Sequence, residues 1–408
     1  MAKEKGKFTI ADLNSAMNKN SKFGGLLSDG HGVSKITEYI SSGNYILNAC
    51  MTGSLFKGIP NNRSICLSGE SGVGKTYLIL NICREAQKKG YFIVFYDSEN
   101  AVDEDLARNF GIDLSMFRYE PVQTVQEFRS NATTLVDTLI EQKGEGNEIP
   151  KVLIALDSVG NLATQKEIDD AKSFSDKSDM SRAKVIKSIF RILMSKLGII
   201  QGSFVFSNHV YSTLDLYAQT IQAGGGGIKY GASLIVNFSK AKLKEGANQT
   251  GIVVTAKPDK NRFCKPTVVK FHISYDHGMN PYVGLEEYMS WDRCGVQRGK
   301  FITKKEYEKL SETQKEPCKQ HPLDENVYFQ PSDTGRNICT KHSVYSFKLN
   351  EIWTKKVWTD DRIAELDEYI KPLFAYSKSG DEEIMDMLNE EENDAVEDDG
   401  MNDEIFGK

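Results

Sequence analysis

Blocks of apolar residues alternate with amphipathic segments through the middle of the chain. Four apolar runs, each short and almost uncharged, predict buried strands at residues 64–69, 91–99, 151–160 and 203–210. The segments between them carry apolar residues about 3.6 positions apart, which predicts helices. Apolar strands that alternate with helices are typical of a parallel sheet covered on both faces. We therefore expect an α/β fold with a mostly parallel central sheet.

The pattern changes near residue 232. Three apolar segments with short connections, at 232–243, 251–258 and 267–275, predict strands that join the sheet as antiparallel additions. Lower hydrophobicity after them predicts a small C-terminal α+β domain. We expect four parts, namely an arm with one short helix at 1–36, a core at 37–284, the small domain at 285–380 and a tail at 381–408.

Acidic residues are concentrated in the tail. Residues 381–408 contain 13 Asp and Glu against one Lys, a net charge of −12, so the other 380 residues carry +6 of the chain's total of −6. A basic body with an acidic tail is common in proteins that handle polyanions. The alternative is a tail that only improves solubility, and both interpretations predict a disordered tail.

Composition places the chain among ordinary globular proteins, with 39% hydrophobic and 26% charged residues. No apolar run approaches the ~20 residues that span a bilayer, and the first residues lack the apolar stretch of a secretory signal. The seven cysteines, an odd number in a large chain, fit reduced thiols better than a disulfide framework. We therefore expect a cytosolic protein with no membrane partner.

The clearest motif is GESGVGKT at residues 69–76, which matches the phosphate-loop pattern in full. It lies between a predicted strand and a predicted helix, where backbone N–H groups and the helix dipole favour phosphate. Lys75 is expected to contact the β- and γ-phosphates of ATP, and the Thr76 hydroxyl to ligate Mg²⁺. The residues expected to bind nucleotide here are Gly69, Glu70, Ser71, Gly72, Val73, Gly74, Lys75, Thr76 and Tyr77.

Two neighbouring strand ends supply carboxylates for hydrolysis. Asp157 ends the strand VLIALD, the position of an acid on the metal side, and Glu99 ends the strand FIVFYDSE, where a carboxylate reaches the attacking water. Asp97 shares that turn, but the chain is leaving the strand there and the two acids need not point the same way. We predict Glu99 as the catalytic base. The alternative for either acid is a solvated strand end.

Six segments in one order resemble a known family, the RecA-type recombinases. They are GESGVGKT, FYDSENAVD, LIALDSVGNLA, SDMSRAKVIKSIFRI, SNHVY and GGGGIKYGAS. The likeness covers about residues 37–285, and DSVGNLA, SDMSRAK and SNHVY resemble the UvsX branch found in tailed phages. The resemblance implies a RecA-type P-loop ATPase core that forms an ATP-dependent helical filament on single-stranded DNA, pairs it with a homologous duplex and exchanges strands in recombination, repair and recombination-dependent replication.

Further expectations come from this resemblance alone. It gives the phosphate-loop residues and the two acids the roles already described, and it makes His209 the γ-phosphate sensor. Asp103 falls where the family contacts adenine, and Lys260 and Arg262 fall on a basic pair that reaches a neighbour's ATP. The resemblance also implies that residues 1–36 contact another subunit, that single-strand-binding and mediator proteins are partners, and that a phage-encoded chain acts in the host cytosol.

A second glycine-rich stretch, at residues 224–227, follows the fourth predicted strand. The pattern predicts no helix behind it, so it lacks the dipole and the lysine of a phosphate loop. In the family this is the mobile loop that lines the DNA axis, here residues 210–228, and a first DNA loop spans about 165–182. The alternative is a flexible surface loop. The residues that the resemblance assigns to DNA are Arg182, Leu214, Gly224, Gly225, Gly226, Gly227 and Lys229.

Two other groupings leave alternatives open. Cys318, His321, Cys339 and His342 form two Cys-x2-His pairs, which either hold a structural Zn²⁺ or are unrelated side chains; the resemblance implies no metal here. The segment WTKKVWTDDR, at 353–362, is either a secondary duplex-binding patch or, as we favour, part of a packed core.

Two rival functions use the same core. A hexameric helicase would need a substantial N-terminal collar, and the 36-residue arm is too short for one. A DNA-binding filament scaffold would bind ATP without turnover, so measured hydrolysis discriminates it.

Overall fold

The computed structural model describes residues 8–19, 25, 26, 28, 34–172, 182–212, 220–222, 226–321, 324–340 and 347–377. The chain divides into two compact units, Met1–Phe374 and Ala375–Lys408. The fold below is that of the first unit. The acidic tail at 381–408 lies outside the described residues.

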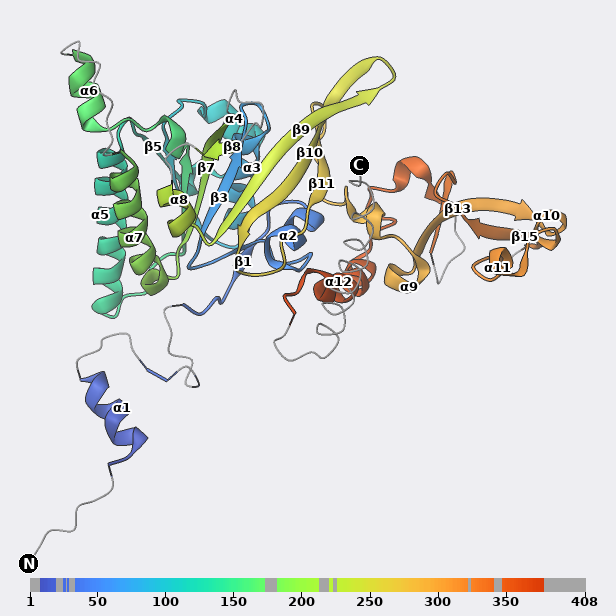
Figure 1. The fold of residues 1–408 in the computed structure, drawn as a ribbon, viewed down its shortest axis with the longest axis horizontal. Helices are drawn as coiled ribbons and strands as arrows, with labels where there is room; N and C mark the ends of the chain where they lie inside the picture. The colour runs from blue at the N-terminus through green and yellow to red at the C-terminus, as the bar shows by residue number, and fades with distance from the viewer. Residues whose placement is uncertain are drawn as a thin grey trace, which may run out of the picture. The chain divides into compact units, whose positions relative to one another are not determined.

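A ten-stranded sheet forms the centre of this unit, in the order β12-β11-β10-β9-β3-β7-β6-β4-β5, with β8 beside β7 (Figure 1). From β9 to β5 all neighbours are parallel, and β10, β11 and β12 add antiparallel. The α/β fold is confirmed. The strands are β3 (Ser64–Gly69), β4 (Phe92–Asp97), β5 (Phe117–Pro121), β6 (Val152–Asp157), β7 (Ser203–Ser212), β8 (Thr220–Gln222), β9 (Leu234–Glu245), β10 (Asn248–Asn261), β11 (Val269–Ser274) and β12 (Gly278–Met279).

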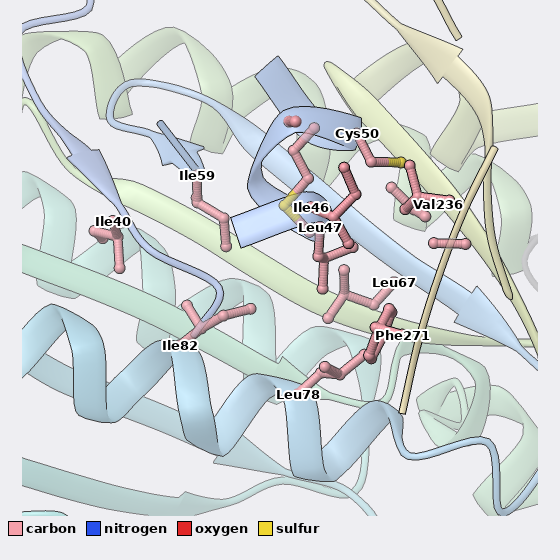
Figure 2. Packing of buried hydrophobic residues seen from close by; sticks show 14 of the residues in the cluster. Ile40, Ile46, Leu47, Cys50, Ile59, Leu67, Leu78, Ile82, Val236 and Phe271 are labelled. Atoms are coloured by element: carbon pink, nitrogen blue, oxygen red, sulfur yellow. The ribbon is translucent and has the colours of Figure 1, made fainter. Parts of the chain in front are cut away.

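Helices cover both faces of the sheet. The strand period of two sends Ile65 and Leu67 of β3 into one hydrophobic cluster and Cys66 into the other. The first cluster includes α2 (Tyr45–Thr52) and α3 (Lys75–Gln87), and the second includes α5 (Val125–Gly144), α7 (Arg182–Ile200) and α8 (Gly226–Gly231). Figure 2 shows part of the first cluster, with Ile46, Leu47 and Cys50 from α2, Leu67 from β3, Val236 from β9, and Leu78 and Ile82 from α3.

Short elements complete the described arm and core. They are α1 (Ile10–Asn18), β1 (Tyr39–Ile40), β2 (Ile59–Pro60), α4 (Glu104–Asn109), η2 (Leu114–Met116), η3 (Val159–Asn161) and α6 (Gln165–Lys172). The short helix expected in the arm is α1, which begins at a capping box formed by Thr9 and Asp12.

The central sheet and its helices differ from the expectations in several places. The segment expected to add antiparallel at 232–243 contains β9, which is parallel to β3, so the antiparallel part begins only at β10. The apolar pattern missed β5, because an edge strand exposes most of its side chains and has no apolar run. It also missed α2, which is too short to repeat its helical period.

A second, five-stranded antiparallel sheet lies in the C-terminal part, in the order β14-β15-β13-β16-β17. This agrees with the expected α+β character. The division between residues 284 and 285 stays a prediction. The elements are η4 (Leu285–Tyr288), α9 (Trp291–Cys294), β13 (Val296–Thr303), α10 (Lys304–Glu308), α11 (Glu312–Lys315), β14 (Lys319–His321), β15 (Asp324–Pro331), β16 (Asn337–Thr340), β17 (Phe347–Lys348), η5 (Leu349–Glu351) and α12 (Asp360–Phe374).

The two tryptophans of 353–362 belong to the packed interior. Trp358 is fully buried in the first cluster and its Nε1–H donates to the Ile352 carbonyl at 2.7 Å. Trp353 is partly buried against the same cluster. The structure therefore favours core packing over a duplex-binding patch.

A buried carboxylate fastens α12 to the turn that follows α2. Asp367 accepts hydrogen bonds from Ser54 Oγ at 3.1 Å and from the Leu55 N–H at 2.6 Å, and Lys371 Nζ lies 3.2 Å away. Asp367→Ala should leave both donors buried without a partner and lower the free energy of unfolding by about 2–4 kcal/mol. Denaturant unfolding tests this, with Glu368→Ala as control because exposed Glu368 bonds the same Lys371. Equal midpoints for the two variants would contradict the prediction.

Candidate nucleotide site

The phosphate loop connects β3 to α3, as the motif predicts. Gly72 and Gly74 adopt left-handed backbone conformations, with φ of 72° and 92°, which residues with a Cβ rarely adopt. Lys75 is 7% exposed, and its Nζ donates to the carbonyls of Gly69 and Glu70, each at 2.9 Å. Burial lowers the pKa of Lys75, and the carboxylates of the site partly oppose this effect. The loop therefore holds its own lysine beside the position expected for phosphate.

Two oxygen ligands meet at the first turn of α3. Thr76 Oγ1 donates to Asp157 Oδ2 at 2.5 Å, and Ser207 Oγ donates to Asp157 Oδ1. Burial raises the pKa of Asp157, although both hydrogen bonds act in the opposite direction. A hydroxyl and a carboxylate from two elements are the oxygen ligands that Mg²⁺ prefers. Thr76 and Asp157 therefore fit the predicted metal position.

Side chains on or just after two neighbouring strands, β6 and β7, position Glu99. Its Oε1 accepts hydrogen bonds from Ser158 Oγ at 2.7 Å and from His209 Nε2 at 2.8 Å. Burial alone would raise the pKa of Glu99, but these two bonds and the charges of His209 and Lys75 hold it below its usual value. The described residues provide no recorded hydrogen bond to Oε2. Glu99 is thus an ionised carboxylate fixed by one oxygen.

Asp97 has a different environment. Its carboxylate accepts the backbone N–H groups of Glu99 at 2.8 Å, Ala101 at 3.0 Å and Val102 at 3.1 Å, and the Tyr119 hydroxyl at 3.2 Å. These bonds use both oxygens to fold the turn that carries Glu99. The geometry therefore supports the choice of Glu99 over Asp97.

One cavity of about 440 Å³ joins these groups, within the usual range for small-molecule sites. Hydrophobic side chains of β10 and β11 form its other wall. Its lining residues are Ser71, Gly72, Gly74, Lys75, Thr76, Tyr77, Glu99, Asp157, His209, Ile252, Ile273, Ser274 and Tyr275.

Comparison with known proteins identifies the family. Residues 9–280, about two thirds of the chain, match the family described as the RecA N-terminal domain. The chain belongs to this family. The match confirms the resemblance to the RecA family that the six sequence segments indicated.

Its relatives include phage, plant and bacterial proteins. The chain is 29% identical over 243 residues to the recombination and repair protein of Enterobacteria phage T4, covering 59% of this chain and 60% of that protein. It is 28% identical to the mitochondrial DNA repair protein recA homolog 3 of Arabidopsis thaliana, covering 59% of this chain and 54% of that one. It is 27% identical to Protein RecA of Fusobacterium nucleatum, and the match covers 68% of this chain and 71% of that protein.

The predicted adenine contact lies outside the cavity lining. Asp103 is the N-cap of α4, and its side chain accepts the Leu106 N–H at 2.7 Å. Tyr77 does line the cavity, and its hydroxyl accepts the Met279 N–H at 2.8 Å. Both therefore have structural roles besides any contact with nucleotide.

The basic pair that the RecA resemblance assigns to a neighbour's ATP lies elsewhere. Neither Lys260 nor Arg262 lines the cavity at the phosphate loop. Arg262 lines a separate hollow of about 780 Å³, together with Arg63, Lys187 and Arg191. Because this larger hollow has none of the nucleotide-site residues, we take the smaller one as the candidate site. A role of the pair in a neighbouring subunit stays a prediction.

The second glycine stretch is followed by a helix, contrary to expectation. The six-residue α8 begins at Gly226. Gly227 is buried, and a Cβ there would lie 3.2 Å from the Ala183 carbonyl oxygen and from Lys187 of α7. Close packing between helices therefore explains Gly227 without DNA. Lys229 is exposed and forms an ion pair with Asp259 at 3.3 Å.

The predicted DNA loops are partly regular structure. Strand β7 continues to Ser212 and pairs with β8, so 210–228 is not one continuous loop. Helix α6 occupies the start of the segment expected as the first DNA loop. Gly224 and Gly225 lie outside the described residues, as do Leu214 and its surroundings.

Arg182 already has partners within the protein. Its Nη2 donates to the carbonyls of Val159 at 3.3 Å and Gly160 at 2.5 Å, in the 3₁₀ turn η3 after β6. Gly160 in turn lies against His209, because a Cβ there would be 3.0 Å from the His209 ring. Contact of Arg182 with DNA phosphate stays a prediction, and it would require exchange of these bonds.

The zinc alternative for the two Cys-x2-His pairs is not supported. Cys339 is on β16 and His321 is on β14, and two strands separate β14 from β16. At about 4.8 Å per strand spacing, the two lie roughly 14 Å apart, too far for one Zn²⁺ with ligands at about 2 Å. The described residues contain no group of three His, Cys, Asp or Glu side chains that could hold a metal. His342 lies outside them.

The sequence analysis missed several residues of the candidate nucleotide site. Ser158 and Ser207 bond the two carboxylates, and Lys240 donates to the phosphate loop. The serines carried a weak signal, since each follows or lies within an apolar strand. The sequence around Lys240 gave no such signal, because only the sheet order brings β9 beside β3.

No helix among the described residues is long and apolar enough to cross a membrane.

Proposed function

We propose that this chain is an ATP-dependent DNA recombinase, which forms a helical filament on single-stranded DNA and catalyses homologous pairing and strand exchange. The observation that carries the proposal is the convergence of Lys75, Thr76, Asp157, Glu99 and His209 on one cavity. Membership of the RecA family directs the choice among P-loop functions. The matched region spans only 60% of the phage relative, so DNA and filament partners are part of the proposal.

The geometry supports a hydrolytic role for each residue. Lys75 exchanges the loop carbonyls for phosphate oxygens, and Thr76 and Asp157 supply the hydroxyl and carboxylate for Mg²⁺. Bound Mg²⁺ neutralises charge on the phosphates of the ATP substrate. Glu99 keeps Oε1 fixed by Ser158 and leaves Oε2 to orient and deprotonate a water.

His209 is suited to sense the terminal phosphate of ATP through its hydrogen bond to Glu99. It is on β7, beside Gly69 of the phosphate loop, and donates to Glu99 Oε1. The same strand leads into the segment that we propose as a DNA loop. Movement of His209 toward a terminal phosphate would therefore release Glu99 and connect nucleotide state with DNA binding.

The arm supports self-assembly. Helix α1 buries none of its residues, and Phe8, Ile10, Leu13 and Met17 are all exposed, Ile10 to 77%. Among the described residues no side chain of α1 is buried, and apolar side chains exposed in this way are suited to bind another surface. We propose a second copy of this chain, in keeping with a filament. Single-strand-binding and mediator proteins are proposed as further partners.

Electron microscopy tests this proposal against its first rival. The full chain is incubated with single-stranded DNA and a non-hydrolysable ATP analogue. The proposal requires helical filaments, whereas six-membered rings would support a hexameric helicase. ATP hydrolysis with and without single-stranded DNA tests the second rival. Filaments without turnover would support a scaffold and contradict the proposed enzyme.

The charge of the tail leads to a prediction for duplex DNA. Deleting 381–408 removes a net charge of −12 and leaves a body of +6. If the tail competes with DNA for basic surface, the truncated protein should bind duplex more tightly, and the difference should shrink as salt rises. A salt series with fluorescent duplex measures this. Identical affinities at low salt would leave the tail only a role in solubility.

A further inference from the structure

One face of β9 changes character along its length. The strand period places Leu234, Val236 and Phe238 on one face, where they are buried in the cluster with α2 and α3. The next side chains on that face are Lys240, Lys242 and Lys244, and all are exposed. The change occurs where the β9–β10 hairpin extends past its neighbours (Figure 1). This face of β9 is therefore buried as far as the end of β3, and beyond that point it carries exposed lysines.

The sheet register brings the first of these lysines to the phosphate loop. Phe238 pairs with Gly69, the last residue of β3. Two residues further along β9, Lys240 Nζ donates to the carbonyls of Ser71 at 3.1 Å and Gly72 at 3.0 Å. A Cβ at Gly72 would lie 2.8 Å from this nitrogen. The lysine head group therefore lies directly against this glycine of the loop.

Two lysines thus bond four consecutive carbonyls of the loop. Lys75 bonds the first two, and Lys240 bonds those of Ser71 and Gly72. A trans peptide is planar and places its C=O and N–H on opposite sides. Fixing these two carbonyls therefore also fixes the N–H groups of Gly72 and Val73, which point away from Lys240. Amides of this loop are the groups expected to bind phosphate.

We propose that Lys240 is a second lysine of the phosphate loop, a positioning residue that orients the Gly72 and Val73 amides for a polyphosphate and adds positive charge beside it. The inference rests on the proposed function, because it takes a nucleoside triphosphate as the ligand. Lys75 must break its hydrogen bonds to the Gly69 and Glu70 carbonyls to reach phosphate, whereas Lys240 keeps its hydrogen bonds to the Ser71 and Gly72 carbonyls. The two lysines therefore have separate roles.

The next lysine on the same face provides a matched control. Lys242 is also exposed and pairs with Ile252 of β10, but among the described residues the structure records no bond from it to the loop. Lys242→Met removes the same charge from the same strand. A difference between Lys240 and Lys242 therefore reports the contact with the loop and not the general charge of the hairpin.

The test measures the affinity of the full chain for a fluorescent ATP analogue, for ADP and for adenosine. Lys240→Met should weaken ATP and ADP binding about tenfold, since charged hydrogen bonds to the loop are lost from an exposed position. Lys240→Gln, which keeps N–H donors without charge, should lose less. Adenosine binding should not change, because it has no phosphate. Lys242→Met should stay within about twofold of the parent.

Salt and thermal unfolding separate this role from a structural one. The loss in Lys240→Met should decrease at high salt but remain measurable, because orientation of the amides is not screened. Its thermal midpoint should equal that of the parent. Equal ATP affinities for Lys240→Met and Lys242→Met, or an equal loss for adenosine, would overturn the inference. If Lys75→Ala has lost ATP binding in the same series, the proposed nucleotide site would survive that result. A parent that binds no ATP would overturn both.

Discussion

Lys75→Ala is expected to weaken ATP binding strongly and to lower turnover by about 10²–10³-fold. The variant removes the buried ammonium of the cavity, and neither Thr76 nor the loop amides can replace its charge at the phosphates. Lys88→Ala is the control, because Lys88 ends the same helix in an exposed position and bonds Glu85. Steady-state hydrolysis and binding of an ATP analogue, both at saturating single-stranded DNA, measure the effect.

The outcome that contradicts this prediction is a folded Lys75→Ala variant with the parent's turnover. Circular dichroism and the thermal midpoint establish folding independently of activity. Parent-like turnover would move the hydrolytic site away from the loop between β3 and α3. It would also remove the basis for the role proposed for Lys240.

Glu99→Gln should reduce turnover by about 10²–10⁴-fold while ATP binding persists. The amide keeps the size of the side chain and can still accept from Ser158 and His209, but it cannot take a proton from water. The pKa of Glu99 is held below its usual value, so the carboxylate is ionised at neutral pH. Turnover should therefore show no loss due to Glu99 between about pH 8 and pH 6.

Asp97→Asn distinguishes the structural role of Asp97 from the catalytic role proposed for Glu99. The four hydrogen bonds of Asp97 hold the turn and use both oxygens, and an amide nitrogen in place of one oxygen cannot accept the bonds made to that oxygen. We expect a lower thermal midpoint for Asp97→Asn and an unchanged midpoint for Glu99→Gln. A stable Asp97→Asn protein with the larger loss of turnover would show that the base is assigned to the wrong residue.

The parts of the fold that follow from short-range pattern were predicted well. Apolar runs located β3, β4, β6 and β7, because strands covered on both faces have few polar positions. The phosphate loop placed Lys75 and Thr76 directly, since motif, strand end and helix start coincide in sequence. Asp157 was expected near the metal because it ends an apolar strand, and the structure places this strand end beside Thr76.

The remaining features depend on contacts between distant segments. The resemblance assigned Gly227 to a DNA-binding loop, yet close packing of α8 on α7 explains a glycine there. The Cys and His pairs had plausible zinc spacing along the chain, but the strand order separates Cys339 from His321. Lys240 had no local pattern at all, since its partner lies about 170 residues earlier in the chain. Such relations require the sheet order, which local periodicity does not contain.

Strand exchange between a single-stranded circle and a linear duplex tests the central claim most directly. With ATP and Mg²⁺, the parent should form joint molecules with homologous duplex and none with heterologous duplex, and Lys75→Ala should form none with either. The account is contradicted if the parent hydrolyses ATP and coats the single strand but forms no joint molecules. It is equally contradicted if joint molecules form regardless of homology.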